Sequence, residues 1–438
     1  MPPSSDEPQA ITLNFKNLVR VAGETIEGTV DLNLPLIRKD GIEELRLEMQ
    51  GIVKTRIYRT YGQVTVVHKQ VLPLFEPFTQ SLWSSSGSSE SDDVASYPFR
   101  FTIPDNLPPS FCYCEKWMSR PSATVRYSLE AVGTRPGVFH RNRRVQRVFL
   151  VMPAATASQL EQAETMRQGW SGPWKGNPAE DKIRQGIWGD YSRVSATLSL
   201  PDLPSLPISA PIPYTLTVTT ETKTLDHSDR PEDKHGKPIF PAPPTQASEL
   251  SLSLRRKVKY TARDSGALHK EKRHDSFDLQ KTVGLSDTTE SPALRRTQPA
   301  EIRRVEPAGD GQVVVDEPEW VPGEDGNKKG IWRRSVHFTS LMALPFAPTT
   351  WSAEILEWSY KLQITIPFPG VGNDLKLEVP IQLNPSAACP PPGSSNLTYA
   401  EILPAGPPPM LDLPPAYWAE DGGDSDSDEK KEKKKKLW

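Results

Sequence analysis

The sequence has few cysteines, no long apolar run and little excess charge of either sign. Three cysteines, Cys112, Cys114 and Cys389, are too few in 438 residues for the disulfide framework of a small secreted domain. The N-terminal stretch "MPPSSDEPQA" lacks the basic and apolar regions of a secretory signal. Apolar runs such as "VFLVM" (148–152) are far shorter than the about 20 residues of a membrane-spanning helix. These features predict a cytoplasmic protein whose membrane contact is at most peripheral.

Catalytic and metal-binding motifs are also missing from the sequence. It contains no HExxH pair, no phosphate-binding G-x-x-x-x-G-K-[ST] loop and no G-x-S-x-G elbow. The "CYC" stretch at 112–114 separates its thiols by one residue, whereas structural zinc sites usually place about two to four residues between them. We therefore expect a packing role for these cysteines, no enzyme activity and no cofactor. The formal net charge of −3 also argues against a basic nucleic-acid-binding protein.

The strongest regular pattern is the two-residue alternation that is typical of half-buried β-strands. In "TIEGTVDLNL" (25–34), Ile26, Val30 and Leu32 fall on one face, and charged or polar residues fall on the other. Antiparallel strands with one buried face have this pattern. The same alternation recurs at 45–49, 123–131, 214–219, 249–254, 357–366 and 374–383. The only stretch that favours a helix is 156–168, which lies between the two strand-rich regions.

Composition and strand pattern together divide the chain into two β-sandwich lobes with polar segments around them. Residues 262–330 are rich in charge, serine and proline and poor in aromatic residues, which predicts a disordered insertion in the second lobe. The serine-rich stretch 84–93 indicates a long hairpin loop. Pro380 predicts that the strand at 374–383 lies at a sheet edge or ends nearby. The expected boundaries are a disordered N-terminus at 1–10, a first lobe at 11–152, a linker at 153–193, a second lobe at 194–386 and a disordered tail at 387–438.

Two motifs follow one another in the first lobe. "VAGETIEGTVDLNL" fits the pattern G-x-x-I-x-G-x-V, and "YPFRFTIPDNLPPSF" fits P-F-x-F-x-[IL]-P with a following proline and serine. The matching residues are Gly23, Ile26, Gly28, Val30, Pro98, Phe99, Phe101, Ile103, Pro104, Leu107, Pro108, Ser110 and Phe111. In this order the motifs resemble the N-terminal lobe of the arrestin family, in its α-arrestin branch. Downstream, 194–218, 250–260, 358–366 and 375–383 resemble the second arrestin lobe more loosely, and the long insertion departs from visual-type arrestins.

The resemblance implies both a fold and a function. The implied fold is all-β, with two antiparallel immunoglobulin-like β-sandwich lobes. The implied function is that of an adaptor, because α-arrestins hold membrane-protein cargo with both lobes and recruit a HECT-type ubiquitin ligase with the tail. The expected partners are a WW-domain HECT-type ligase, the cytoplasmic tails of plasma-membrane transporters or receptors, and covalently attached ubiquitin. Such an adaptor is cytoplasmic and is recruited to the plasma membrane and endosomes.

The tail contains the stretch "LDLPPAYW" (411–418), which holds a P-P-x-Y motif. Pro414 and Pro415 favour the polyproline II conformation, whose fixed backbone lowers the entropy lost on docking into an aromatic groove. A WW domain offers such a groove and a pocket for Tyr417, and Leu413 adds apolar contact ahead of the motif. From 45 prolines and 11 tyrosines, roughly 0.1 such motifs are expected by chance. The stretch therefore predicts a WW-domain ligand.

Basic residues near the end of the first lobe indicate a surface for acidic cargo. The stretch "FHRNRRVQRVFL" (139–150) and the first strand region supply them. The candidate residues are Lys16, Arg20, Arg141, Arg143, Arg144 and Arg147. Gathered on one face, they would read acidic or phosphorylated cytoplasmic tails. Charges that protect an edge strand against pairing with another chain give the same pattern, so both interpretations stand.

Three further residues lie in patterns that protein kinases recognise. Ser276 in "KRHDSF" and Thr297 in "RRTQP" follow basic residues, and Ser425 lies in the acidic run "EDGGDSDSDE". A phosphate at these positions adds negative charge and creates a site for a phosphobinding partner. A solubilising role explains the acidic and lysine-rich end of the chain more simply, and lysine contact with anionic lipid is a further option.

Two other functions fit parts of the sequence. An arrestin-fold coat or sorting subunit would act in trafficking without a ubiquitin ligase, and it would tolerate the loss of Tyr417. A sugar-binding sandwich would use exposed tryptophans as stacking platforms. However, Trp358 is in phase with Tyr360 and Leu362, as a core residue is, so the adaptor is the favoured interpretation.

Overall fold

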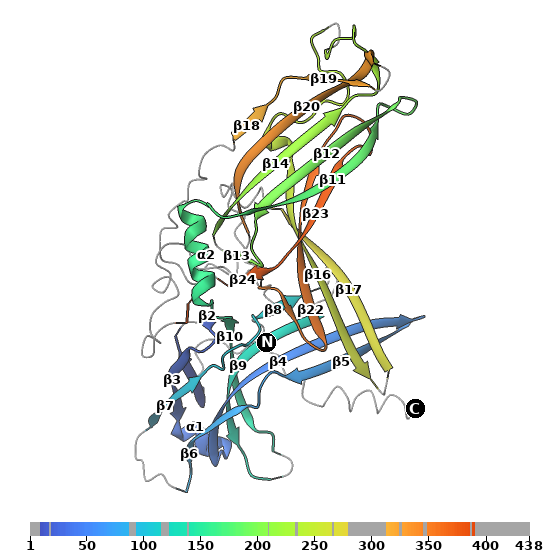
Figure 1. Cartoon of the computed structure of the whole chain (residues 1–438). Helices are drawn as coiled ribbons and strands as arrows, with labels where there is room; N and C mark the ends of the chain where they lie inside the picture. Colours follow the sequence, from blue (N-terminus) through green and yellow to red (C-terminus); the bar gives the residue numbers. More distant parts are fainter. Residues whose placement is uncertain are drawn as a thin grey trace.

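The computed structural model divides the chain into two lobes, the first at the bottom of Figure 1 and the second at the top. It describes residues 9–16, 19–86, 93–114, 122–137, 140–208, 210–232, 235–264, 267–278, 312–323, 326–344, 348–385 and 388–389. Helix α2 (Ala157–Gln168) lies along one side of the molecule and connects the last strand of the first lobe to the first strand of the second (Figure 1). Both lobes consist mainly of antiparallel strands, which confirms the predicted all-β fold.

Two sheets build the first lobe. Its strands are β1 Ile11–Phe15, β2 Val19–Val21, β3 Thr25–Asn33, β4 Glu44–Tyr61, β5 Val64–Pro73, β6 Phe78–Ser84, β7 Val94–Thr102, β8 Phe111–Tyr113, β9 Ala123–Thr134 and β10 Arg143–Met152. One sheet has the order β1-β3-β7, and the other has the order β2-β10-β9-β4-β5. In the second sheet β6 also pairs with β4, β8 pairs with β9, and β2 runs parallel to β10.

Alternating apolar residues place the core of the first lobe. In β4, Leu45, Leu47 and Met49 are buried, and the residues between them are partly exposed. The central strand β9 is buried from Ala123 to Gly133, so it is covered on both faces. Two half-buried sheets that share one apolar interior make the sandwich that the strand pattern predicts.

The second lobe contains two larger sheets and one short pair. Its strands are β11 Trp174–Arg184, β12 Tyr191–Pro201, β13 Leu206–Pro207, β14 Pro211–Glu221, β15 Leu225–Asp226, β16 Ser251–Asp264, β17 Ala267–Asp278, β18 Gln312–Val315, β19 Glu319–Gly323, β20 Gly326–Ala343, β21 Trp351–Ser352, β22 Leu356–Ile366, β23 Leu375–Ile381 and β24 Leu383–Asn384. One sheet has the order β11-β12-β14-β20-β15, with β18 and β19 also paired to β20. The other has the order β17-β16-β22-β21, with β23 also paired to β22, and β13 pairs with β24. Trp358 of β22 is fully buried, which confirms its prediction as a core residue.

The predicted disordered insertion at 262–330 is wrong at both ends. β16 and β17 continue one ordered sheet to Asp278, and β18 to β20 belong to the other sheet of the second lobe from Gln312. Charge and serine made these residues look unable to fold, but β17 gains a full backbone ladder on β16 and needs only one covered face. Residues 279–311 lie outside the described residues.

The stretch 84–93 also differs from its prediction as a hairpin loop. β6 before it pairs with β4 in one sheet, and β7 after it pairs with β3 in the other. The strands on either side of it therefore belong to different sheets and do not form a hairpin, which the serine-rich composition cannot reveal because composition says nothing of strand pairing. The prediction for Pro380 is confirmed, since it lies opposite Lys361 and β23 pairs only with β22 among the described strands.

One helix agrees with the prediction and one was missed. α2 begins with a capping box in which the Thr156 side chain accepts from the Gln159 amide, and Gln159 accepts from the Thr156 amide in return. The missed helix, α1 (Leu34–Asp40), begins where the Asn33 side chain accepts from the Leu36 amide at 3.2 Å. It ends at Gly41, whose φ of 65° is in the left-handed region. Asn33, a following proline and Gly41 were the available signals.

The lobes meet along the hairpin of β16 and β17, which reaches from the second lobe toward β4 and β5 (Figure 1). At one end of this contact, His68 of β5 stacks on His269 of β17 with 3.7 Å between ring centroids. At the other end, Phe111 of β8 stacks on Trp358 of β22 with centroids 4.2 Å apart. Both ends are therefore held by flat ring contacts between the lobes.

Candidate binding surfaces

The predicted tail site lies outside the described residues. This holds for the WW-domain ligand Leu413, Pro414, Pro415 and Tyr417, and for the phosphosites Thr297 and Ser425. Ser276 is described, and it lies in β17 opposite Arg255 of β16. It therefore belongs to a paired strand and not to the disordered insertion in which the sequence placed it, and its role as a phosphosite stays a prediction.

Arg20 does not belong to the predicted cationic face. The residue is fully buried, and its guanidinium donates to the Glu24 carboxylate and to the Lys16 carbonyl oxygen. The second carboxylate oxygen of Glu24 accepts from the Val21 amide at 3.0 Å. A buried guanidinium needs such partners because its desolvation is otherwise uncompensated. Arg20 is therefore a structural residue of the first lobe, and the alternation of the short strand β2 was too brief to show it.

Arg147 is likewise used inside the first lobe. Its guanidinium donates to the carbonyl oxygens of Leu13 and Phe15, at 3.0 and 3.4 Å, and lies 4.4 Å from the centroid of the Phe15 ring. Burial lowers the pKa of this guanidinium from its ordinary value, although the group stays charged at neutral pH. Arg147 thus ties β10 to β1 and offers little to a ligand.

The remaining basic residues of the predicted face are exposed. Arg144 donates to the Glu130 carboxylate at 3.0 Å, so part of its charge is already compensated. Lys16, Arg141 and Arg143 are exposed and form what is left of the predicted face. The structure thus reduces the face to a smaller group than the sequence indicated.

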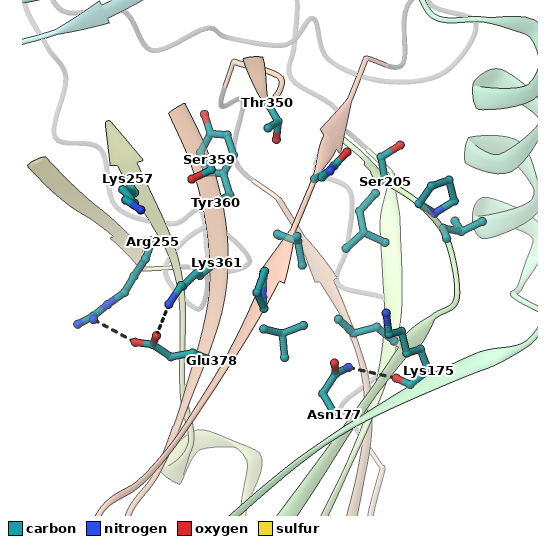
Figure 2. A pocket seen from close by; sticks show the side chains of 18 of the residues that line it. Lys175, Asn177, Ser205, Arg255, Lys257, Thr350, Ser359, Tyr360, Lys361 and Glu378 are labelled. Carbon is teal, nitrogen blue, oxygen red and sulfur yellow. Dashed lines mark hydrogen bonds and ion pairs between the residues drawn. The ribbon is translucent and has the colours of Figure 1, made fainter. Parts of the chain in front are cut away.

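A groove in the second lobe gathers more basic side chains than the exposed part of the predicted first-lobe face. It has a volume of about 900 Å³, at the upper end of the range for small-ligand pockets. It is lined by Lys175, Asn177, Leu200, Pro201, Asp202, Leu203, Pro204, Ser205, Leu206, Arg255, Lys257, Lys272, His274, Thr350, Ser359, Tyr360, Lys361, Glu378, Val379, Pro380, Ile381 and Gln382. We call it the C-lobe groove. Figure 2 shows Arg255, Lys257 and Lys361 on one side and Lys175 and Asn177 of β11 on the other.

Strand register explains why the cations gather. In β16, the two-residue period turns Arg255 and Lys257 away from the buried face that carries Leu254 and Val258. Pairing then sets His274 of β17 directly beside Lys257. The same pairing brings further basic residues alongside, because Lys259 faces Lys272 and Arg255 faces Lys361 of β22. Three neighbouring strands therefore present one cationic surface.

The electrostatics of the groove show an excess of positive charge. Glu378 accepts from Lys361 at 2.9 Å and from Arg255 at 3.4 Å, and the hydrogen bond from Lys361 lowers its pKa. Burial lowers the pKa of Lys257, and the charges of Lys259 and Lys272 lower it further. Such mutual repulsion arises when cations outnumber the acids beside them.

The same causes act on His274 at the rim of this surface. Burial lowers its pKa first, and the charges of Lys272 and Lys257 add to the effect. His274 is therefore neutral at pH 7 and accepts a proton only below its ordinary range of about 6.5. A negatively charged ligand offsets the repulsion among the lysines and the effect of their charges on His274. The groove is therefore suited to anions.

Apolar residues also line the groove. Leu200 and Leu206 come from β12 and β13, and Val379 and Ile381 come from β23; all four are largely buried. A ligand with both carboxylates and apolar side chains matches this combination better than a purely polar ion does. The groove is thus a candidate site for an acidic peptide.

Comparison with known families assigns the first lobe. Residues 10–158, which span β1 to β10 and the start of α2, match the family model of the arrestin (or S-antigen) N-terminal domain. The first lobe is an arrestin N-terminal domain. An arrestin N-terminal domain indicates a role as a trafficking adaptor. No curated protein sequence matches the chain.

The described part of the chain contains neither a membrane-spanning helix nor a cluster of metal-binding side chains. No helix there has the length and apolar character needed to cross a membrane. Nor do His, Cys, Asp and Glu side chains gather in the described ranges in groups of three or more that could hold a metal ion. Cys112 in β8 and Cys114 just after it lie close together, with their Sγ atoms 3.7 Å apart.

The C-lobe groove was missed at the level of sequence, although part of its signal was visible. "SLSLRRKVKY" (251–260) alternates, so Arg255, Lys257 and Lys259 had to share a face. The stretch that completes the surface, 267–278, had been assigned to a disordered insertion. Without β17, the row of lysines looked like an ordinary solvated strand face.

Proposed function

We propose that this protein is an adaptor of the α-arrestin type, which brings a WW-domain HECT-type ubiquitin ligase to membrane-protein cargo and thereby promotes ubiquitination and endocytosis of the cargo. The observation that carries this proposal is the presence of an arrestin N-terminal domain and a P-P-A-Y stretch on one chain. In this role the protein is not an enzyme and binds no nucleic acid. It acts in the cytoplasm, is recruited to the plasma membrane and endosomes, and itself carries ubiquitin.

The ligase contact is assigned to the tail. Pro414 and Pro415 supply the polyproline II geometry, Tyr417 fills a pocket of the WW domain, and Leu413 adds apolar area. Short peptides bind through a few such anchors, so a single truncation removes most of the affinity. Ala416 is the spacer of the motif and contributes little.

The cargo contact is assigned to the C-lobe groove, with the exposed residues of the first-lobe face as a secondary surface. Lys257, Lys272 and Lys361 supply positive charge, and Leu206 and Ile381 supply apolar surface. This combination favours a cytoplasmic tail in which acidic and apolar residues alternate. In the first lobe, Arg20 and Arg147 already have partners, which supports the groove as the main cargo site.

The ligase half of the proposal is tested with the full-length chain and the purified WW domains of a HECT-type ligase. We expect Tyr417→Ala to weaken binding at least tenfold, roughly the 1.4 kcal/mol or more that an anchor residue contributes. The matched control, Ala416→Ser, changes the spacer of the same motif and should bind like the unaltered chain. Unchanged binding of Tyr417→Ala would refute the assignment of the ligase to this motif.

The same variant separates the adaptor from a coat or sorting subunit. In cells, an adaptor that carries Tyr417→Ala should lose its own ubiquitination and should fail to internalise its cargo. A coat subunit acts without a ligase, so cargo internalisation should persist. If cargo internalisation persists in Tyr417→Ala as it does in Ala416→Ser, the protein acts as a coat subunit and not as an adaptor.

A further inference from the structure

Cys112 and Cys114 form a close thiol pair that no part of the adaptor function uses. Their Sγ atoms are 3.7 Å apart, which is within hydrogen-bond distance for two sulfur atoms. Cys112 is buried in a small apolar cluster with Val21, Val148 and Leu150, whereas Cys114 is only partly buried. One thiol is therefore shielded by the sheet and the other is open to a small reagent.

The backbone brings the two residues to the upper limit of disulfide spacing, so a bridge requires Cys114 to move toward Cys112. Residues two apart in a strand have Cα atoms roughly 6.4–6.8 Å apart, which is within the usual limit for a disulfide of about 6.8 Å. β8 pairs with β9 only from Phe111 to Tyr113, so Cys114 lies just beyond the ladder. Its movement toward Cys112 breaks no strand pairing.

The electrostatic surroundings make Cys114 the reactive member. The hydrogen bond with Cys112 lowers the pKa of Cys114 and raises that of Cys112. The guanidinium groups of Arg256 and Arg126 act on Cys112 in the opposite direction and hold positive charge beside the pair. A thiolate is the nucleophilic form of cysteine, so the hydrogen bond from Cys112, together with the greater exposure of Cys114, favours reaction at Cys114.

Cys389 provides a comparison within the same chain. It is exposed, yet burial of its sulfur and the nearby carboxylates of Glu24 and Asp105 raise its pKa. Exposure alone would make Cys389 the first thiol to react. Thiolate character makes Cys114 the first, so the order of reaction separates the two explanations.

We propose that Cys112 and Cys114 are a redox-active dithiol that a hydroperoxide converts to an intramolecular disulfide. The Cys114 thiolate attacks one peroxide oxygen, the O–O bond breaks, and Cys114 becomes a sulfenic acid with release of hydroxide. The Cys112 sulfur then attacks the sulfenic sulfur and displaces its oxygen, which leaves as water with the Cys112 proton. The hydroxide takes the proton that Cys114 had lost. Two electrons from the thiols thus reduce one hydrogen peroxide to two waters.

Cys112 lies in β8, a first-lobe strand that contacts the second lobe, and Cys114 follows that strand directly. Phe111 of β8 stacks on Trp358 of the second lobe with centroids 4.2 Å apart, and the Arg256 guanidinium lies 5.1 Å from the Phe111 ring centroid. Disulfide formation shortens the Sγ–Sγ distance from 3.7 Å to about 2.05 Å and so pulls on the end of β8. Oxidation therefore loosens the Phe111–Trp358 contact between the lobes.

The test treats the reduced full-length chain with hydrogen peroxide and follows its thiols by peptide mass spectrometry. The tryptic peptide 101–116 contains both cysteines of the pair, so the disulfide appears as the loss of two hydrogen atoms from this peptide. We expect this species to form before Cys389 is modified, and dithiothreitol should reverse it. Modification of Cys389 first, or sulfinic acid at Cys114 with Cys112 still reduced, would overturn the proposal.

Cysteine variants show which thiol attacks the peroxide and which one resolves the sulfenic acid. If a variant fails to fold, the unaltered chain still shows whether the pair reacts before Cys389. Cys112→Ser should leave Cys114 as a sulfenic acid that dimedone traps, and Cys114→Ser should leave Cys112 reduced. Cys389→Ser is the matched control and should form the disulfide at the original rate. Absence of dimedone adduct in Cys112→Ser would contradict the assignment of Cys114 as the attacking thiol.

The coupling to the lobe contact has its own readout. Hydrogen exchange of the oxidised chain should rise in β8 and in β22 around Trp358, and it should stay unchanged in β20, which is remote from the pair. Dithiothreitol should restore the original exchange. A disulfide that forms without any change in β8 and β22 would refute the effect on the lobes while leaving the dithiol itself established.

Discussion

Basic residues have different tasks in the two lobes. In the first lobe, Arg20 and Arg147 point inward and donate to Glu24 and to backbone carbonyl oxygens. In the second lobe, Lys257 and Lys272 lie on an open sheet face with few acids beside them. The difference shows that a basic stretch in a sequence identifies a binding surface only when the strand register is known. We therefore assign anion binding to the C-lobe groove.

Removing Arg20 is the most severe way to test the structural role of the first-lobe residues. Arg20→Met keeps an apolar stem but leaves the Glu24 carboxylate buried without its partner. We expect the free energy of unfolding of the first lobe to fall by about 3–5 kcal/mol, measured by urea denaturation. Lys257→Met, in the groove, is the control and should change it by less than about 0.5 kcal/mol. Equal effects of the two substitutions would remove the distinction between the lobes.

Charge reversal in the groove tests the binding role of the second lobe. In Lys257→Glu combined with Lys272→Glu, two cations that face the ligand become anions. A synthetic peptide of alternating glutamate and leucine should bind at least about tenfold more weakly, because opposite charges now repel. Arg141→Glu combined with Arg143→Glu is the matched control in the first lobe and should have a much smaller effect. The reverse ranking, measured by calorimetry, would return the cargo site to the first-lobe face.

Arg147 provides a smaller test of the same distinction. Arg147→Met removes the hydrogen bonds to the Leu13 and Phe15 carbonyl oxygens and the contact with the Phe15 ring. We expect a loss of about 1–2 kcal/mol in the free energy of unfolding and no change in affinity for the acidic peptide. Arg143→Met, at an exposed position of the same strand, should be close to neutral. Loss of peptide binding without loss of stability would show Arg147 to be a ligand-binding residue.

The smallest expected effect concerns pH. The pKa of His274 is lowered, so the imidazole is neutral at pH 7 and gains its charge only as the pH falls below about 6.5. Peptide affinity should therefore rise about threefold between pH 7 and pH 5.5, a gain of the size of one exposed ion pair. His274→Asn should remove this rise. A rise of the same size in the variant would assign the pH effect to another group.

The sequence predicted the strands better than their partners. Alternation located the strands around Ile26, Leu47 and Trp358, because a two-residue period reports which face of a strand is buried. Alternation did not locate β17, because its side chains are mainly charged. This strand forms because its backbone pairs with β16. Composition also could not show that β6 and β7 belong to different sheets, since strand pairing is a long-range property.

The candidate sites show the same limit. Arg20 and Lys257 are both basic residues in short alternating stretches, yet one is fully buried and the other lines a groove. What separates them is the presence of Glu24 beside Arg20 and of β17 beside Lys257. Neither neighbour relation follows from composition or local periodicity. The tail motif, by contrast, is local, and the sequence alone was enough to predict it.

The account's central claim is that ligase and cargo use separate parts of one chain. The most direct measurement is the binding of a WW domain and of the glutamate–leucine peptide to the same two full-length variants. Tyr417→Ala should lose the WW domain and bind the peptide normally, whereas Lys257→Glu combined with Lys272→Glu should bind the WW domain normally and lose the peptide. Loss of both ligands in either variant, or retention of both in Tyr417→Ala, would contradict the claim.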